Sequence, residues 1–459
     1  MRKLALLPLF LTTACSYLGQ IAWNALDQAG RYSTKQVTAG EIDAGGARVV
    51  RVVNGINFPS AMTWDDKGRM FIVESHTVPA PILKARVIRV DGDRIDTLVT
   101  LPGETGIGIT FHDGWLYVSH EEKDATFSIS RIRPDGGALE AVVRNLPTQG
   151  DHDVNYLTFA QDGTLWFGVG SASNSGVIAA DDPVNQKWLA THPDAHDVSC
   201  RDIVLTGQKF TDKGGATGAY QPYKSADATR IAGAVPCTGA VFRVRPGSTT
   251  PELVAWGFRN PVAVVFDGVG NAFVAMQGAD TRSTRPVVDD PDAIYALKEN
   301  AWYGWPDYRA DFSEVRPFVI DHAASGLTVA DRSLLVAPLT PHAAVCGVTF
   351  ARDGRLLIAE MGDFKPMTDN AHPTQRAGFQ VESLDTRGGA KSVFARNRGT
   401  GASEPASTLD LRNGFERPVD VKIGPDGNVY VLDFGAFVTT GEQPKAMPKT
   451  GKVFRIEAR

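Results

Sequence analysis

The chain has 459 residues, of which 43% are hydrophobic and 22% charged, and its formal net charge is -5 at pH 7. This composition is that of a globular protein that buries a large core. No run of lysine and arginine is present to neutralise phosphates, which argues against a nucleic-acid partner. The 46 glycines and 27 prolines indicate many turns and favour β-structure over a helical bundle.

The first residues are typical of an export signal. The basic residues Arg2 and Lys3 precede an apolar segment, residues 4–11, that is too short to span a bilayer. The residues before Cys15 resemble a bacterial lipoprotein cleavage site, but the leucine that usually stands three places before the cysteine is absent. We therefore predict a signal peptide over residues 1–20 and a periplasmic or extracellular protein. Whether Cys15 is lipidated, which would anchor the protein to a membrane, stays open.

A hairpin pattern then recurs six times along the chain. Each copy consists of an apolar run, a turn built on glycine, and a second apolar run, and the glycine supplies the positive φ that such turns need. Most copies are followed by a further pair of strand-like runs. This pattern predicts an all-β fold, a six-bladed β-propeller of four-stranded antiparallel blades. The six copies are residues 58–75, 104–121, 152–171, 259–278, 343–362 and 417–435.

The two ends of the chain are predicted to complete one blade together. The sixth copy is followed by a single strand-like run, residues 451–456, which leaves its blade one strand short. Residues 47–53 form an apolar run before the first copy and can supply the missing strand. Pairing of the N- and C-terminal strands therefore closes the ring, and we predict one propeller domain over residues 47–459.

The repeat is interrupted at about residues 181–235, which are rich in Asp, Gly, Ala and Thr. We interpret this segment as an insertion that covers one face of the propeller, since loops of this length are commonly functional. Cys200 and Cys237 flank its second half. In an oxidising compartment these two cysteines can form a disulfide. The sequence does not decide whether they are bridged. A second long excursion spans residues 280–339.

The hairpin register places several polar residues on one face of the propeller, because a hairpin begins and ends at the same edge. At the start of the first strands lie His152, Arg259 and Arg417. A neutral imidazole at a concave mouth can accept a proton, and arginines there can bind an anion. At the exits lie Glu74, His120, Glu360 and Asp433, which we interpret mainly as structural pairing partners.

Other common catalytic patterns are absent from the sequence. There is no CxxCH for covalent haem, no GxSxG nucleophile elbow, no P-loop and no GxGxxG opening a helix. The cluster at residues 191–197 has metal-ligating residue types, but we interpret it as a polar surface turn.

Two segments resemble the pyrroloquinoline quinone (PQQ)-dependent sugar dehydrogenases, the group of soluble glucose dehydrogenase and sorbosone dehydrogenase-like proteins. They are WGFRNPVAVVFD at residues 256–267 and WYGWPDY at residues 302–308, and the resemblance extends over most of the chain from about Arg51. Members of that family are six-bladed propellers, which agrees with the repeat count made from the residues.

The resemblance implies a set of site residues. It implies that His152 is the general base and that Arg259 and Asn260 contact the quinone. It also implies that Arg417 neutralises carboxylates of PQQ, with Lys365 close to the position of a cofactor lysine. The backbone carbonyls of Gly278 and Ala279 are expected to bind Ca²⁺, which prefers oxygen ligands and would polarise the quinone.

Three positions depart from the pattern of the family. The aspartate that orients the histidine is Ser171 here, the cofactor lysine falls on Gly362, and an arginine four residues after the histidine is Tyr156. Without a carboxylate at position 171, His152 lacks a group that would hold its tautomer and raise its basicity.

These observations predict an exported PQQ- and Ca²⁺-dependent oxidoreductase that oxidises an aldose or related sugar. Electrons would pass to a separate acceptor, because the sequence offers no haem site. Two alternatives stay open. One is a non-catalytic propeller that binds a carbohydrate or a protein, and the other is a metal-dependent propeller lactonase whose ligands would be Glu74, Glu360 and Asp433.

Overall fold

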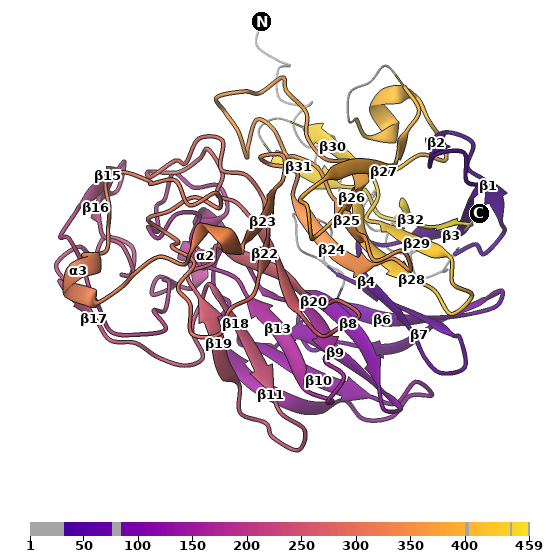
Figure 1. Ribbon diagram of the computed structural model, residues 1–459, viewed down its shortest axis with the longest axis horizontal. Coiled ribbons are helices and arrows are strands. Elements are labelled where there is room, and N and C mark those ends of the chain that lie inside the picture. Colours follow the sequence, from indigo (N-terminus) through magenta and orange to yellow (C-terminus); the bar gives the residue numbers. More distant parts are fainter. Residues whose placement is uncertain (1–31, 76–83, 400–403, 441–442, 458–459) are drawn as a thin grey trace, which may run out of the picture.

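The computed structural model describes residues 32–75, 84–399, 404–440 and 443–457. The described residues form six antiparallel sheets of four or five strands, together with short two-stranded pairs (Figure 1). The first strand of each sheet contacts the first strands of the sheets on either side, in the order β4, β8, β12, β20, β24, β28 and back to β4. The predicted six-bladed β-propeller is therefore confirmed.

The first three blades contain the first three predicted hairpins as their inner strand pairs. Blade 1 consists of β4 (Pro59–Trp64), β5 (Met70–Glu74), β6 (Arg86–Asp91) and β7 (Arg94–Thr100). Blade 2 consists of β8 (Gly106–His112), β9 (Trp115–Glu121), β10 (Phe127–Ile132) and β11 (Glu140–Leu146). Blade 3 consists of β12 (Val154–Phe159), β13 (Leu165–Val169), β18 (Ala240–Val244) and β19 (Glu252–Trp256).

The remaining three blades follow the same plan. Blade 4 consists of β20 (Asn260–Phe266), β21 (Ala272–Gln277), β22 (Ala293–Ala296) and β23 (Leu335–Pro338). Blade 5 consists of β24 (Val345–Phe350), β25 (Leu356–Glu360), β26 (Gln380–Leu384) and β27 (Lys391–Asn397), extended by β2 (Ile42–Asp43). Blade 6 consists of β28 (Pro418–Ile423), β29 (Val429–Asp433), β32 (Gly451–Ile456) and β3 (Val49–Ile56), extended by β1 (Val37–Thr38).

Closure of the ring follows the prediction. Strand β3, near the N-terminus, pairs antiparallel with β32 at the C-terminus, from Val49 opposite Ile456 to Ile56 opposite Gly451. Strand β3 begins two residues later and ends three residues later than the predicted run. The two ends of the chain thus share blade 6, and no unpaired edge is left between the first and last repeats.

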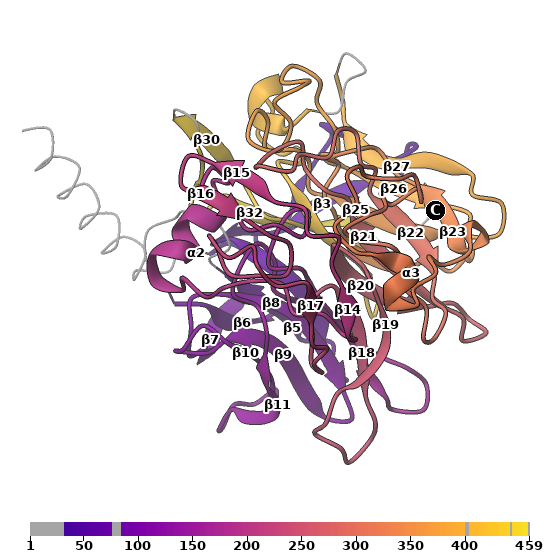
Figure 2. The same cartoon turned by 90° about the vertical axis from the view of Figure 1, so that its left-hand side faces the viewer.

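The insertion lies between β13 and β18 in the sequence. It contains α2 (Asn185–Thr191), β14 (Ile203–Val204), β15 (Phe210–Asp212), β16 (Gly215–Thr217) and β17 (Arg230–Ile231). Cys200 and Cys237 form a disulfide. The insertion lies to the left of the blades in Figure 1, and Figure 2 shows it from that side, in front of them.

The second excursion is only partly a loop. It contributes β22 and β23, the two outer strands of blade 4, and between them lie α3 (His322–Ser325) and the 3₁₀ helix η1 (Arg332–Leu334). A further 3₁₀ helix, η2 (Ala406–Leu409), and the hairpin of β30 (Phe437–Thr440) and β31 (Gln443–Ala446) lie next to blade 6 in sequence.

Tyr156 holds the inner strands of three blades together. Its hydroxyl lies 2.7 Å from the carbonyl oxygen of Ser60 on β4 and 2.5 Å from that of Val419 on β28. The side chain is buried, so these contacts lie inside the ring of inner strands.

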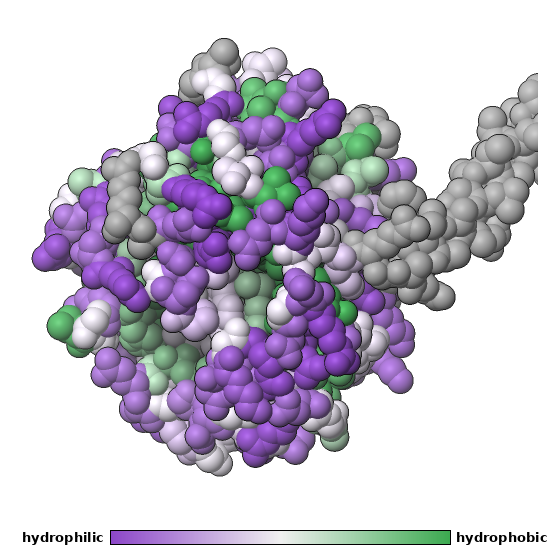
Figure 3. Space-filling view, turned by 90° about the vertical axis from the view of Figure 1, so that its right-hand side faces the viewer, coloured by the Kyte–Doolittle hydropathy of each residue, from purple (hydrophilic) through white to green (hydrophobic). Residues whose placement is uncertain are grey.

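The outer surface differs from this core. The face shown in Figure 3 is mostly hydrophilic, with small apolar patches between the polar side chains. Within the described part of the chain, no helix has the length and hydropathy needed to cross a membrane. The predicted signal peptide, residues 1–20 with Cys15, lies outside the described residues.

Candidate functional site

A cavity of about 280 Å³ lies where strands β12 and β20 begin and strands β21 and β25 end. This volume is close to the lower end of the roughly 300–1,000 Å³ typical of small-ligand sites. The cavity brings together four of the seven residues that the sequence predicts for the site: His152, Arg259, Asn260 and Gly278. Its wall also contains polar residues that the sequence did not single out: Asp151, Asp280, Arg282, Asp292 and His342.

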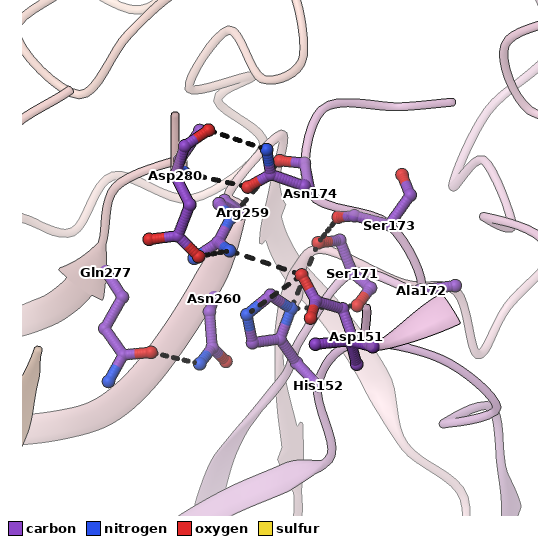
Figure 4. A network of polar contacts seen from close by, with 12 residues as sticks. Asp151, His152, Ser171, Ala172, Ser173, Asn174, Arg259, Asn260, Gln277 and Asp280 are labelled. Atoms are coloured by element: carbon purple, nitrogen blue, oxygen red, sulfur yellow. Dashed lines mark hydrogen bonds and ion pairs between the residues drawn. The ribbon is translucent and has the colours of Figure 1, made fainter. Parts of the chain in front are cut away.

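His152 is held with one defined nitrogen available. Its Nδ1 atom lies 3.0 Å from the backbone carbonyl oxygen of Ser171 (Figure 4). A carbonyl can only accept, so Nδ1 carries the proton and the lone pair is on Nε2. Gly170 permits this approach, because a Cβ atom there would lie 2.3 Å from the Cβ of His152. The backbone therefore orients the imidazole, although position 171 is a serine.

Burial keeps His152 neutral. It lowers the pKa of His152 to about 4, and the nearby carboxylate of Asp151 opposes this only in part. The distance between Nε2 of His152 and Oδ2 of Asp151 is 3.8 Å. A neutral histidine with a free lone pair is able to act as a general base, while its low pKa means that it releases the proton again readily.

Asp151 is the partner of His152 that the sequence reasoning missed. Its Oδ2 atom accepts from Nη2 of Arg282 at 2.6 Å and from Nη2 of Arg259 at 3.2 Å. Burial alone would raise the pKa of Asp151, but Arg282, His152 and Arg259 together outweigh burial, so the pKa is lowered. The only local signal is that Asp151 directly precedes His152, since Arg282 lies 131 residues away in sequence.

Arg259 is buried, with 4% of its side chain exposed, and four of its five N–H groups donate to protein oxygens. Its Nη2 atom also donates to Oδ2 of Asp280 at 3.0 Å. Its Nε atom donates to the carbonyl oxygen of Asn174 at 3.2 Å, and its Nη1 atom donates to that of Gly278 at 2.7 Å. The guanidinium group thus faces the cavity from a fixed position.

Arg282 ties the insertion to the propeller. Besides Asp151, it pairs with Asp280 at 3.0 Å and with Asp182, which belongs to the insertion. Burial would lower the pKa of Arg282, but the three carboxylates outweigh it and raise the pKa. Because these partners come from three separate segments, Arg282 fixes how the insertion meets the cavity.

His342 is a second histidine in the cavity wall, and its pKa is shifted in the direction opposite to that of His152. Its Nδ1 atom lies 3.5 Å from Asp280 and its Nε2 atom lies 3.8 Å from Asp369. Burial would lower the pKa of His342, but Asp280 and Asp369 outweigh it and the pKa is raised. His342 directly precedes the fifth repeat, so the register that singled out His152 was also the signal that would have found it.

Asn260 belongs to a chain of amides beside His152. Its Nδ2 atom donates to Oε1 of Gln277 at 2.8 Å, and its Oδ1 atom accepts from Asn155 at 2.7 Å. Gln277 in turn donates to the carbonyl oxygen of Val345 at 2.8 Å. These contacts join the inner strands of blades 3, 4 and 5.

Arg417 and Lys365 lie outside this cavity and line a separate hollow of about 80 Å³. Arg417 donates to the carbonyl oxygens of Gly362 at 2.8 Å and Asp363 at 2.9 Å, and its guanidinium lies 4.0 Å from the ring centre of Phe364. Lys365 pairs with Asp369 at 3.1 Å. The structure therefore does not bring these two predicted cofactor residues to His152.

The predicted calcium ligands do not fit a Ca²⁺ ion in this arrangement. The carbonyl oxygen of Gly278 already accepts a hydrogen bond from the positively charged Arg259 at 2.7 Å. A Ca²⁺ ion bound to the same oxygen, at the usual roughly 2.3–2.6 Å, would lie against that positive charge. Ala279 does not line the cavity. Among the described residues, no group of three or more His, Cys, Asp or Glu side chains is arranged to hold a metal ion.

The cavity does fit a planar, anionic quinone. The flat or flexible apolar side chains of Met361, Phe364 and Phe434 line one part of the wall. Arg259 and His342 line another part, and the pKa of His342 is raised, which favours its charged form. The Nε2 atom of His342 is buried and makes no hydrogen bond, and its nearest charged neighbour is the carboxylate of Asp369 at 3.8 Å. This nitrogen is therefore a polar atom left for a ligand.

The polar residues at the strand exits lie away from this cavity. Glu74 pairs with Arg86 at 2.5 Å, Glu360 accepts from Gln380 at 2.9 Å, and Asp433 accepts from backbone amides of residues 416 and 417. His120 is buried, with its Nε2 atom 2.8 Å from the hydroxyl of Ser130. None of these four residues lines the cavity. These contacts lie within single blades: Glu74 in blade 1, His120 in blade 2, Glu360 in blade 5 and Asp433 in blade 6.

Solved structures of sugar dehydrogenases have a similar fold. The chain is similar to the holo form of the pyranose dehydrogenase PQQ domain from Coprinopsis cinerea, with 16% identity, a TM-score of 0.55, and coverage of 94% of this chain and 98% of that one. It is similar to the PQQ-bound aldose sugar dehydrogenase from Streptomyces coelicolor, with 15% identity, a TM-score of 0.50, and coverage of 92% and 99%.

A third similar structure is the calcium form of a family AA12 carbohydrate-active enzyme from Trichoderma reesei. The identity is 16%, the TM-score is 0.51, and the match covers 92% of this chain and 97% of that one. No protein-family model and no curated protein matches the chain. The resemblance to PQQ-dependent sugar dehydrogenases is thus confirmed at the level of the fold, along nearly the whole chain.

Proposed function

We propose that this protein is an exported oxidoreductase that oxidises an aldose or related sugar with PQQ as its cofactor. The observation that carries the proposal is the orientation of His152, whose Nδ1 atom donates to the carbonyl oxygen of Ser171 so that the Nε2 lone pair is free. The PQQ-bound form of the aldose sugar dehydrogenase from Streptomyces coelicolor, which shares the fold, supports it.

The residues of the cavity have complementary roles in such an oxidation. PQQ, when bound, supplies the hydride acceptor. His152 accepts the proton of the sugar hydroxyl at Nε2, which a neutral imidazole is able to do. Asp151, 3.8 Å from Nε2, then faces the imidazolium and stabilises its charge. Arg259, Asn260 and His342 are the residues that would hold the cofactor.

The disulfide supports export. Cys200 and Cys237 are bridged, and disulfides persist mainly in oxidising compartments such as the periplasm and the extracellular space. The reduced cofactor would pass its electrons to a separate acceptor. The proposal leaves the lipidation of Cys15 as an alternative to simple cleavage of the signal peptide.

The decisive experiment adds PQQ to the purified protein and follows dye reduction over a panel of aldoses. We expect a shift in the quinone absorbance and sugar-dependent dye reduction. If neither the absorbance shift nor dye reduction occurs with any sugar, the proposal is refuted.

One observation favours a second candidate, a propeller that binds carbohydrate without oxidising it. Arg417 and Lys365 are both engaged with other groups in a separate hollow. Sugar binding measured by calorimetry, without any change in the quinone absorbance, would favour this alternative. The lactonase alternative has no such support, because Glu74, Glu360 and Asp433 do not meet in one site.

A further inference from the structure

In the turn that follows β21, the backbone carbonyl oxygen of Gly278 points towards the guanidinium of Arg259. The carbonyl oxygen of Gly278 accepts from Nη1 of Arg259 at 2.7 Å, and both residues line the cavity that contains His152. In the calcium-binding arrangement that the family resemblance implied, this oxygen faces a metal ion.

The turn is fixed, so this direction is a property of the fold. Its three successive amides, those of residues 278, 279 and 280, donate to Asp292 at 2.9 Å, to Asp290 at 2.6 Å and to Asn174 at 2.8 Å. A Cβ atom at Gly278 would lie 2.4 Å from the carbonyl oxygen of Pro291. Rotating the Gly278 carbonyl would break these contacts.

Arg259 is fixed as firmly as the turn. Its guanidinium also donates to the carbonyl oxygen of Asn174 and to the carboxylates of Asp151 and Asp280, at 3.0–3.2 Å. Because only 4% of its side chain is exposed, the guanidinium cannot rotate out into solvent. The positive charge therefore stays at the Gly278 carbonyl.

Two of the carboxylates in the cavity wall that would attract a divalent cation are already paired with arginines. Asp151 and Asp280 each pair with both Arg259 and Arg282. A Ca²⁺ ion at this turn would have to displace an arginine from a buried ion-pair network, which leaves charges without partners. The chain thus supplies its own cation at the place where the quinone would need one.

We propose that Arg259 provides the positive charge at the Gly278 turn in place of a calcium ion, so that PQQ binds without a divalent cation. The inference rests on the proposed function, since it assumes that a quinone occupies the cavity. Arg259 is then the group that polarises a quinone oxygen, a role that a fixed guanidinium can fill because it is always charged.

The first test is PQQ binding with and without calcium. Protein freed of metal by EGTA is titrated with PQQ, and the quinone absorbance is followed once in EGTA and once in about 1 mM Ca²⁺. We expect the two Kd values to agree within about twofold. An affinity that is about tenfold or more higher with Ca²⁺ would overturn the inference.

The second test separates this inference from the proposed function. Ca²⁺ alone is titrated calorimetrically into the protein without PQQ, and Tm is measured with and without Ca²⁺. We expect no saturable heat and no rise in Tm, whereas saturable binding that Arg259→Lys alters would overturn the inference. Absence of PQQ binding in both EGTA and Ca²⁺ would refute the proposed function, and the calcium titration would still decide the inference.

The third test removes the charge. Arg259→Met keeps the length of the side chain, and we expect PQQ affinity to fall by about tenfold or more, with added Ca²⁺ now improving it. Arg259→Lys keeps the charge but loses the planar fork, and we expect weaker binding that stays indifferent to Ca²⁺.

Arg243 is the matched control for these variants, because it pairs with Glu252 and Glu299 outside the cavity. Arg243→Met should bind PQQ like the unmodified protein. Circular dichroism and Tm show whether each variant is folded. If folded Arg259→Met binds PQQ with unchanged affinity, or if Arg259→Lys needs Ca²⁺, Arg259 does not have this role.

Discussion

The Nδ1 atom of His152 lies 3.0 Å from the backbone carbonyl oxygen of Ser171, and the hydroxyl of Ser171 lies 3.3 Å from the same nitrogen. That hydroxyl donates in turn to the carbonyl oxygen of Ser173 at 2.6 Å. The imidazole is therefore oriented by main chain, where the resemblance implied a carboxylate. This relationship makes the serine itself dispensable for the tautomer.

Replacing Ser171 tests this directly. In Ser171→Ala the backbone carbonyl remains, so we expect turnover to stay within about threefold of the unmodified protein. In Ser171→Asp a carboxylate next to Nδ1 should raise the pKa of His152 above its value of about 4. Both effects are measured by steady-state kinetics and by NMR titration of the imidazole. A loss of turnover of about a hundredfold in Ser171→Ala would show that the hydroxyl, not the main chain, orients His152.

Removing the base should separate chemistry from cofactor binding. His152→Ala loses the proton acceptor, and general bases contribute about 10²–10⁴-fold, so we expect kcat to fall by at least about a hundredfold. PQQ absorbance titration should still show binding, because Arg259, Asn260 and His342 remain. His196→Ala is the matched control, since His196 is partly exposed on the insertion and does not line the cavity. Unchanged kcat in His152→Ala would remove His152 from the reaction.

How far the sequence predicts this protein depends on whether a feature is local. The six hairpins were predictable because each depends on a turn glycine and on neighbouring apolar residues, and the closure by β3 followed from counting strands. The ion pair of Asp151 with Arg282 was not predictable, since 131 residues separate them and Arg282 lies in an irregular segment. The orientation of a side chain in such a segment is set by packing between distant parts of the chain.

Arg417 illustrates the same limit at a position inside the repeat. Its place in the register was predicted, and β28 does begin directly after it. Its guanidinium, however, is held by the carbonyl oxygens of residues 361–363 and packs against the ring of Phe364. The register fixes where a Cα atom lies, but contacts with another blade decide where a long side chain ends.

The two histidines of the cavity should make the stability of the folded state depend on pH in opposite directions. The pKa of His152 is lowered from 6.5 to about 4, so the folded state takes up its proton only at lower pH than the unfolded chain. Its contribution, about 3 kcal/mol, is fully present above about pH 6.5 and is lost as the pH falls towards 4. Denaturant unfolding from pH 7 to pH 4 should show this loss, and His152→Ala should flatten it. A slope that is the same in both proteins would contradict the prediction.

His342 should affect the stability of the folded state at higher pH than His152 does. Its pKa is raised above 6.5 because Asp280 and Asp369 outweigh burial. Its stabilising contribution is therefore present below pH 6.5 and is lost as the pH rises through the raised value. His342→Gln should remove this loss in denaturant unfolding between pH 6 and pH 9, while His196→Gln should keep it. An unfolding profile of His342→Gln that still falls like that of the unmodified protein would assign the loss to another group.

Replacing Arg282 should weaken the contact between the insertion and the propeller. It pairs with Asp182 of the insertion, with Asp151 next to His152, and with Asp280. Arg282→Met leaves these buried carboxylates without one of their cations, and breaking a buried ion pair typically costs about 3–5 kcal/mol. We expect a lower Tm and, in limited proteolysis, faster cleavage within residues 181–235, since the insertion loses its tie to the blades. Arg243→Met, at a partly exposed ion pair on β18, should change Tm and cleavage little. If Arg282→Met lowers Tm without faster cleavage of the insertion, Arg282 stabilises the propeller and does not hold the insertion in place.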